Sequence, residues 1–485
     1  MLNLFGDADP SFAFSLAGCV SASITSPIST FGRRGTTQIL LQSLTVTFEG
    51  QSEVITPETG YAPVRLCSIS HELLTDGPVE LSNEGHEESD EPCSWNVTFD
   101  IRVPGWLPTT SVFGDATTAG AGTHYALYAT ATFVSVNDGG SIFSLCASFY
   151  RSRARTVHAP KCPITVRRTI QPSAGPSCCQ FPMSLYAVDA QRETPGGHEL
   201  SPKAAIPPEI LKRIEVVACV PTAVAMNESS MSFVLRLRAN GLTEVERQCL
   251  RVTEFSVDLE QIEIYRNNQC REHIARYPIP SQEQQPPLTP LLDPHPIHTL
   301  YDAGLLFPCR PLKPSTDRIF SLLPPDESGR YVIAGDGRVF TSGNASGPDA
   351  NWYILETNVP IAQEHSEADW AGPRVRRTTE SSPLFSVRHF IHVGIQCAFD
   401  HPTAGETAHE RLHFSIPLRH VEVPDMAAPL TGSEIVHASH SSTDLQKSSP
   451  HSHTLPAYSQ LFHSNGERKI DHSVPLPVYE PPLRI

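Results

Sequence analysis

The sequence has few of the motifs by which common enzyme classes are recognised. Its 485 residues include no GxSxG, no P-loop and no GxGxxG that leads into a helix. The Cys and His residues form no nucleophile pairing that is recognisable from their spacing. We therefore expect a non-catalytic protein that uses no cofactor.

Basic clusters and long apolar runs are also missing. The chain has a net charge of −16 and no run of basic residues, which disfavours a nucleic-acid partner. Its apolar stretch "FAFSLAGCV" is too short to cross a bilayer. The preceding "MLNLFGDADP" has acids where a signal peptide has bases. These features predict a cytoplasmic protein with no integral membrane span.

No CxxC spacing occurs among the twelve cysteines, which are scattered along the chain. Their even number would allow six disulfides, but their scatter favours reduced, mostly buried thiols. A metal site is not expected either. In "RHFIH", His389 and His392 fall on opposite faces of an expected strand, so the two rings diverge.

The sequence does contain repeated alternation of apolar and polar residues. In "WNVTFDIRV", Phe99, Ile101 and Val103 alternate with polar residues, and "SLTVTFEG", "SFVLRLR", "VRHFIHVGIQCAF" and "RLHFSIPLRH" follow the same period. A period of two indicates strands with one buried face, as in antiparallel sandwiches. Helical patterns are weak, and the best candidate is the short segment 207–214. The sequence predicts an all-β fold of two tandem immunoglobulin-like sandwiches.

The strand patterns fall into two blocks that are followed by a polar tail. A segment rich in Pro, Ser and Gly separates the blocks, and a Pro-rich stretch near 271–318 that is unsuited to a central strand interrupts the second. The tail is rich in Ser, His and Pro, a composition typical of disorder. The expected parts are a first sandwich over 11–170, a linker over 171–206, a second sandwich over 207–424 and a disordered tail over 425–485.

Two Pro-Tyr signals lie in this tail. The prolines of such a signal preset the polyproline II conformation, which WW domains bind in an aromatic groove. Both copies have the form LPxY, with Leu where the usual PPxY form has its first Pro. Two copies about twenty residues apart raise the effective concentration of the ligand. The predicted partner-binding residues are Leu455, Pro456 and Tyr458 in the first copy, and Pro475, Leu476, Pro477 and Tyr479 in the second.

Four stretches together resemble arrestin-like proteins of the fungal α-arrestin type. "LAGCVSASI" followed by "SLTVTFEG" resembles the opening of the amino-terminal domain. "VTFDIRVPGWLPTTSVFG" followed by "THYALYATA" resembles the family's strand, LP turn and Tyr-bearing strand. "SPLFSVRHFIHVGIQCAF" with "ERLHFSIPLRHV" resembles the closing strand pair of the carboxy-terminal domain, and the LPxY tail resembles that of fungal members. The resemblance covers both strand blocks and the tail, and is poor across about 271–380.

The resemblance implies an arrestin fold of two tandem sandwiches and the work of an adaptor. Such an adaptor brings a WW-domain HECT-type ubiquitin ligase to a plasma-membrane transporter or receptor, which is then ubiquitinated and endocytosed. It would be recruited peripherally to the plasma membrane or endosomes. The alternative is a structural scaffold for protein trafficking that recruits no ligase and uses the tail as a spacer.

Overall fold

The strands dominate the computed structural model, and the few helices are short. The prediction of an all-β protein is therefore confirmed. The chain divides into two units, Met1–Asp425 and Met426–Ile485. The residues that the structure describes are 1–24, 36–86, 91–113, 121–136, 154–172, 180–189, 191–192, 205–305, 311–341, 352–401, 405 and 407–424.

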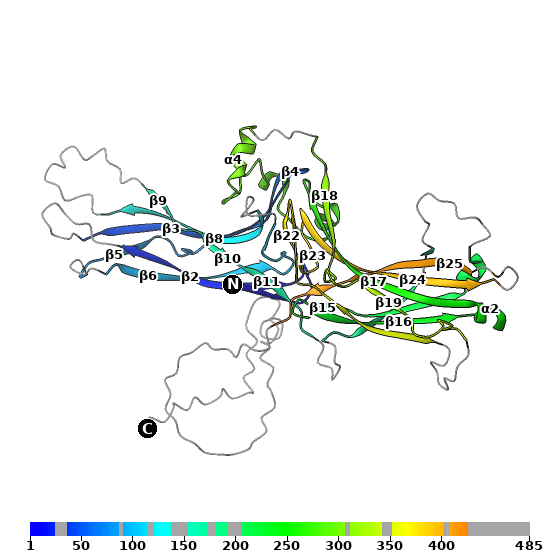
Figure 1. Ribbon diagram of the computed structural model, residues 1–485. Coiled ribbons are helices and arrows are strands. Elements are labelled where there is room, and N and C mark those ends of the chain that lie inside the picture. The colour runs from blue at the N-terminus through cyan, green and yellow to red at the C-terminus, as the bar shows by residue number, and fades with distance from the viewer. Residues whose placement is uncertain are drawn as a thin grey trace, which may run out of the picture. The chain divides into compact units, whose positions relative to one another are not determined.

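The amino-terminal region, which we define as residues 1–169, is built on one seven-stranded sheet and a two-stranded ribbon. The strands of the sheet are β3 (Gln38–Thr56), β4 (Gly60–Glu72), β5 (Val79–Ser82), β7 (Ser111–Val112), β8 (Gly122–Ser135), β9 (Arg155–His158) and β10 (Cys162–Ile164), and the ribbon pairs β2 (Ala13–Ile24) with β6 (Cys93–Pro104). The central order is β10-β8-β3-β4 (Figure 1). Val46 and Phe48 of the sheet share a buried apolar cluster with Leu16, Phe99 and Ile101 of the ribbon. The predicted apolar faces of these strands are thus confirmed.

The carboxy-terminal region, residues 180–424, contains a four-stranded and a second seven-stranded sheet. The first consists of β12 (Met183–Val188), β14 (Ile214–Pro221), β16 (Ser230–Ala239) and β20 (Tyr353–Pro360). The second consists of β13 (Gln191–Arg192), β25 (Thr407–Leu418), β24 (Phe385–Asp400), β17 (Leu250–Arg266) and β18 (Ser315–Ser321), with β19 (Arg330–Val332) and β23 (Glu380–Ser381) at its margins. Phe233 and Leu235 from one sheet and Ile391, Val393 and Ile416 from the other share one buried cluster. The alternation in these three strands has its predicted buried face.

Three short strand pairs each lie within one region. They are the parallel pairs β1 (Leu2–Phe5) with β11 (Val166–Thr169) and β15 (Val224–Ala225) with β26 (His420–Val421), and the antiparallel pair β21 (Glu364–Asp369) with β22 (Gly372–Val375). A further bridge joins Thr169 to Glu422. Tyr265 and Phe385, from the ends of β17 and β24, belong to the amino-terminal apolar cluster. The two regions therefore share buried surface.

The helices lie between strands. They are α1 (Pro208–Leu211), α2 (Glu244–Cys249), α3 (Arg271–Arg276), α4 (Ile297–Asp302) and the short 3₁₀ turn η4 (Gln282–Gln284). The first confirms the helix expected within 207–214. Sequence reasoning missed α2, although Thr243 and Glu246 form a capping box whose signature is legible in the sequence.

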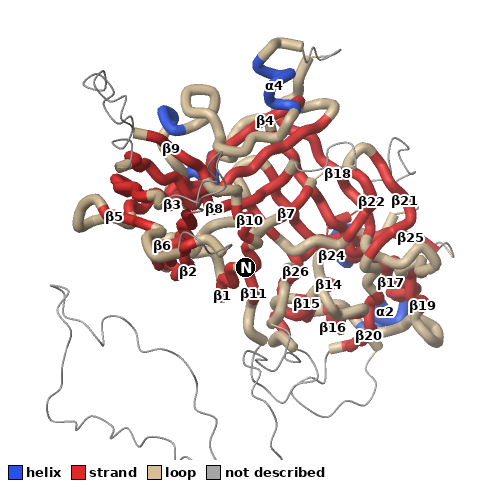
Figure 2. Tube along the Cα trace, turned by 90° about the vertical axis from the view of Figure 1, so that its left-hand side faces the viewer, coloured by secondary structure: helices blue, strands red, loops and turns tan. Residues whose placement is uncertain are grey.

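The Pro-rich insertion leaves β17 in the carboxy-terminal region and returns to it at β18. In between, its described residues form α3, η4 and α4 and no strand, as its proline content predicts. In Figure 1, α4 lies beside β4, and Figure 2 shows the same proximity from another side. We call residues 278–305 the strap. The sequence placed this stretch within the second block, but the strap packs against the first.

Candidate functional site

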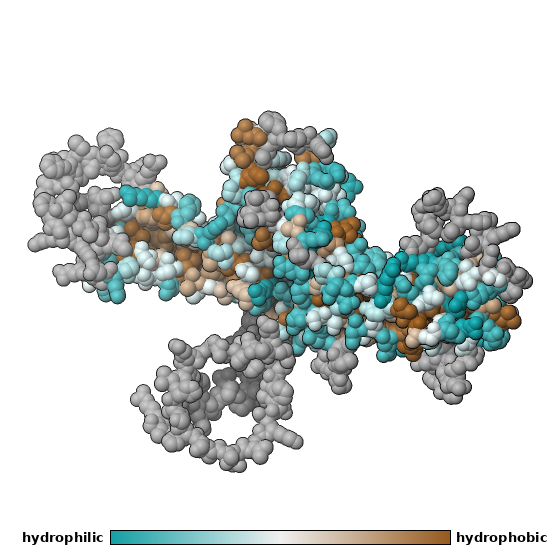
Figure 3. Space-filling view, in the orientation of Figure 1, coloured by the Kyte–Doolittle hydropathy of each residue, from teal (hydrophilic) through white to brown (hydrophobic). Residues whose placement is uncertain are grey.

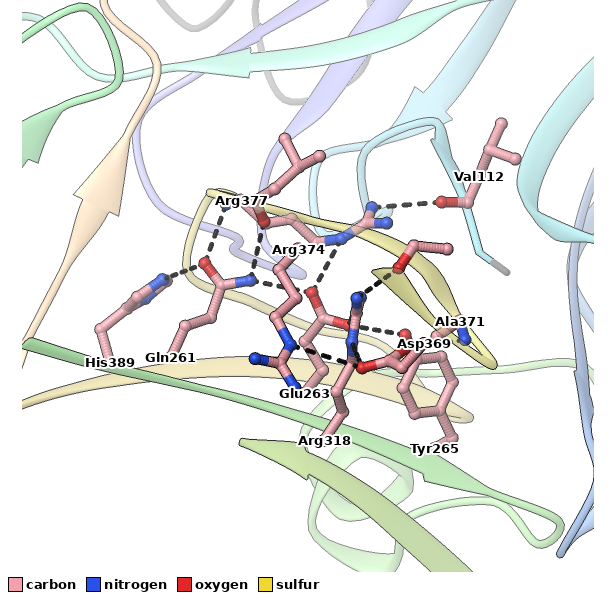
Figure 4. Close-up of polar contacts among 12 residues, drawn as sticks. Val112, Gln261, Glu263, Tyr265, Arg318, Asp369, Ala371, Arg374, Arg377 and His389 are labelled. Carbon is pink, nitrogen blue, oxygen red and sulfur yellow. Dashed lines mark hydrogen bonds and ion pairs between the residues drawn. The ribbon is translucent and has the colours of Figure 1, made fainter. Parts of the chain in front are cut away.

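The most distinctive feature of the described residues is a buried network of charges at the end of β17 (Figure 4). Gln261, Glu263 and Tyr265 occupy every second position of this strand and therefore point to the same side of it. Glu263 is fully buried. Its carboxylate accepts hydrogen bonds from Gln261 Nε2 at 2.8 Å and from the Tyr265 hydroxyl at 2.6 Å. Burial, together with the Glu263 charge, raises the pKa of Tyr265, so this hydroxyl remains a donor.

Two arginines complete the coordination of Glu263. Arg377 Nε lies 3.0 Å from Oε1 and Arg318 Nη1 lies 3.3 Å from Oε2. Arg318 also donates to Asp369 Oδ2 at 2.8 Å and to the Gly372 carbonyl at 2.6 Å, which fixes the β21–β22 hairpin. Burial opposes the charge of Arg318, but Glu263 and Asp369 outweigh this effect and raise its pKa. The buried carboxylate thus has the paired, hydrogen-bonded environment that a buried charge requires.

A chain of hydrogen bonds extends the network to two buried histidines. Gln261 Oε1 only accepts, so at 3.0 Å it fixes the proton of His389 on Nε2. The other ring nitrogen, Nδ1, then accepts from the Thr379 hydroxyl at 2.8 Å. Arg376 Nε donates to His420 Nδ1 at 2.8 Å. Both rings are therefore held neutral, and burial, aided by Arg376, lowers the pKa of His389 to about 3.

A second network with the same design lies in the amino-terminal region under the strap. Gln51 Nε2 donates to Glu53 at 3.0 Å, and the Tyr61 hydroxyl donates to Glu53 at 2.6 Å. The strap supplies two further partners: His295 N donates to Glu53 at 2.9 Å and the Asp293 carbonyl accepts from Gln51 at 2.7 Å. Each region thus holds one buried Gln-x-Glu pair with a Tyr on the carboxylate.

Arg65 of β4 fastens the strap. Its Nε lies 2.9 Å from Glu49 in an ion pair that is almost fully buried. Its other nitrogens donate to strap carbonyls, those of Gln284, Thr289 and Pro290. The side chain of Gln285 bonds both the backbone N and the carbonyl O of Arg65, at 2.8 and 2.9 Å, in the manner of a neighbouring strand. The strap therefore covers part of the open edge of β4.

A small cavity lies where the two regions meet. It has a volume of about 120 Å³, and its lining includes Trp106, Arg168, Glu380 and His420. Glu380 of β23 accepts from the backbone N and the hydroxyl of Thr109, at 2.8 and 2.7 Å. These bonds cross from the carboxy-terminal to the amino-terminal region and help to join them.

The buried polar groups of these networks are paired with one another. The carboxylates are saturated by donors, and within the described ranges no group of three His, Cys, Asp or Glu could hold a metal ion. The eight described cysteines are free thiols, but only Cys67 and Cys397 are buried, so the expectation of mostly buried thiols is wrong for this part of the chain. Burial raises the pKa of these two to about 12. A thiol in this state is a poor nucleophile.

Sequence reasoning overlooked one match to the zinc-hydrolase motif HExxH, at His409 to His413. The structure places this match in strand β25. A strand separates its residues i and i+4 by about 13 Å, whereas ligation of one zinc by both histidines needs a helix. Glu410 points to the opposite, buried side, where it pairs with Arg192 at 2.7 Å and accepts from Ile206 N at 2.9 Å. The match to the motif therefore does not form a zinc site.

The residues predicted to bind a partner lie elsewhere. Leu455, Pro456, Tyr458, Pro475, Leu476, Pro477 and Tyr479 all fall beyond residue 424, outside the described residues. The prediction for them therefore stays a prediction. His389 and His392, by contrast, are described, and they diverge as expected: His389 is buried and His392 bonds Glu260 at 3.1 Å on the other face.

The buried networks were not predicted. One signal was present in the sequence, because "GQSE" and "EQIE" both place Gln two residues before Glu in an apolar alternating strand. The partners could not be inferred, since Arg65 lies about 220 positions from the strap residues that it binds.

Comparison of the chain with protein-family models and with curated proteins gives no match. In the part of the chain that the structure describes, no helix is long and apolar enough to cross a membrane.

Proposed function

We propose that the protein is an arrestin-like adaptor that links a WW-domain HECT-type ubiquitin ligase to a membrane transporter or receptor. The observation that carries the proposal is the pair of LPxY copies, Leu455–Tyr458 and Leu476–Tyr479, which follow an all-β body. Each copy offers a Pro–Tyr anchor to an aromatic groove, and two copies on one tail reinforce each other.

The finer fold proposal is a tandem pair of immunoglobulin-like sandwiches. Two separate apolar clusters, each drawing on a large sheet and a smaller set of strands, support it. In this proposal the sandwiches hold the cargo, and the tail brings the ligase to the plasma membrane or endosomes.

The experiment is the capture of a WW-domain array by the full chain and by the Tyr458→Ala, Tyr479→Ala double variant. We expect the double variant to lose at least tenfold in affinity, because both aromatic anchors are gone. Phe462→Ala is the matched control, since it removes a tail aromatic that lies between the two copies. Equal binding of the double variant and the control would refute the tethering proposal.

The second candidate is a trafficking scaffold that recruits no ligase. Deletion of residues 425–485 separates the candidates, because it leaves the described strands intact. An adaptor without its tail keeps cargo and loses the ligase, whereas a scaffold keeps every partner. Affinity purification of both forms, followed by identification of the retained proteins, distinguishes these results.

A further inference from the structure

The strap and the residues just after it present an unusual density of exposed apolar side chains. We call this set the apolar ridge, and it consists of Leu288, Leu292, Leu300, Tyr301, Leu305 and Leu312. Leu288 is 67% exposed and Leu305 is 64% exposed. Figure 3 shows hydrophobic surface on the projection that carries α4. Six large apolar side chains left in water within 25 residues indicate a surface that is covered in use.

The part of the ridge around α4 is one contiguous surface. Tyr301 packs edge-on against Tyr61 of β4, with ring centroids 5.4 Å apart. Leu312 lies against Gly60, which precedes Tyr61 in the chain. A Cβ added at Gly60 would lie 3.3 Å from the Leu312 side chain. Leu305 N donates to the Leu300 carbonyl at 2.9 Å, which folds the chain after α4 back onto it. These side chains therefore surround the turn between β3 and β4.

Hydrogen bonds to β3 and β4 fix the backbone of the strap, which carries most of the ridge. Arg65 binds three carbonyls of the strap, while Glu49 and Glu53 accept from Leu292 N and His295 N at 2.7 and 2.9 Å. Buried polar contacts thus fix the strap backbone while the leucines face outward. The side chains cannot turn inward without the loss of these hydrogen bonds.

Two ion pairs lie at the margin of the ridge. Lys313 lies 2.9 Å from Glu58, and Lys161 pairs with Asp293. Both lysines are thus neutralised locally, so the leucines and the tyrosine beside them present an apolar surface with no basic group to attract an anionic one. A protein partner would need a matching hollow, whereas the acyl boundary of a bilayer accepts any projecting apolar group. Tyrosine is itself favoured at that boundary, because its ring is apolar and its hydroxyl is polar.

We propose that the apolar ridge inserts into the interface of a zwitterionic lipid bilayer and gives the protein a weak, charge-independent membrane contact. The proposal does not depend on ligase recruitment, because the ridge and the LPxY copies are separate parts of the chain. The net charge of −16 opposes adsorption to anionic membranes, so the contact must come from apolar insertion.

The test is co-sedimentation of the full-length protein with phosphatidylcholine vesicles. We expect the wild type to sediment with them, and the triple variant Leu300→Ser, Tyr301→Ser, Leu305→Ser to lose at least tenfold in partitioning. The matched control is Leu185→Ser with Ile354→Ser, which removes two exposed apolar side chains from β12 and β20. Thermal unfolding of each variant establishes that the fold is kept, as expected for exposed positions.

Three results would overturn the proposal. The first is equal sedimentation of the wild type and the triple variant. The second is binding that appears only with phosphatidylserine and disappears in high salt, which would indicate an electrostatic contact elsewhere. The third is no vesicle binding by a wild type whose self-association, measured by analytical ultracentrifugation, is lost in the triple variant. That result would make a second copy of this chain the occupant of the ridge.

Discussion

At the residue scale, the Tyr265 hydroxyl donates the shorter of the two hydrogen bonds to Oε2 of the fully buried Glu263 carboxylate. We expect Tyr265→Phe to lower the free energy of unfolding by about 1.5 to 3 kcal/mol, the range for a hydrogen bond to a charged group. The bond at 2.6 Å is lost and water cannot replace it at this depth. Urea denaturation followed by tryptophan fluorescence measures the change.

Tyr331→Phe is the control for this substitution. Tyr331 of β19 stacks on Phe255 with ring centroids 4.8 Å apart, so its contribution is mainly that of the ring. We expect it to change stability by less than about 0.5 kcal/mol. Equal losses in the two variants would mean that the Glu263 network contributes nothing specific to folding.

At the scale of elements, the strap should detach when its anchor is removed. In Arg65→Met, Glu49 stays buried without its partner, and such a loss costs about 3 to 5 kcal/mol. Release of the strap from β4 reduces this cost by letting water reach Glu49. We therefore expect faster cleavage by Glu-C protease after Glu283, which is exposed in η4.

Arg238→Met serves as the control for the strap. Arg238 pairs with Glu215 across β16 and β14, so the variant also loses one arginine and one ion pair. Its cleavage after Glu283 should match that of the wild type. The strap is not anchored by Arg65 if both variants are cut at the same rate.

The strands were easier to predict from the sequence than the strap. The buried face of a strand can be predicted from the strand's own residues, because the period of two is a local property. In β16, for example, this period marks Phe233, Leu235 and Leu237 as buried. The sequence of the strap predicts only that the segment is not a strand. Its position on β4 depends on Arg65 and Gln285, which meet through folding and not through proximity in sequence. The networks share this limit, because Arg318 approaches Glu263 only after β18 pairs with β17.

At the scale of the whole described body, the two regions are joined by polar and apolar contacts. Tyr265 and Phe385 extend into the amino-terminal cluster, Glu380 binds Thr109, and the strap crosses from one region to the other. Loss of order in one region therefore exposes buried groups of the other. A change that weakens one junction should lower the stability of both.

The buried histidines make this joined body sensitive to acid. Burial lowers the pKa of His389 to about 3 and that of His273 to about 4, and places that of His420 well below 6.5. Below pH 6.5 these histidines bind protons in the unfolded chain but not in the folded chain. The free energy of unfolding therefore falls as pH falls. For His389 this loss is about 2 kcal/mol at pH 5. Glu380 and Glu228, whose pKa burial raises, act in the opposite direction.

His389→Gln isolates this histidine, because glutamine has no proton to take up in this range. The slope of unfolding free energy against pH, measured by urea denaturation between pH 6.5 and 5, should fall by close to one proton. His413→Gln, an exposed position on β25, is the control and should leave the slope as it is in the wild type. If the slope stays unchanged in His389→Gln, the ring is protonated in the folded protein. The hydrogen bonds that His389 makes with Gln261 and Thr379 then cannot fix the ring in the neutral form.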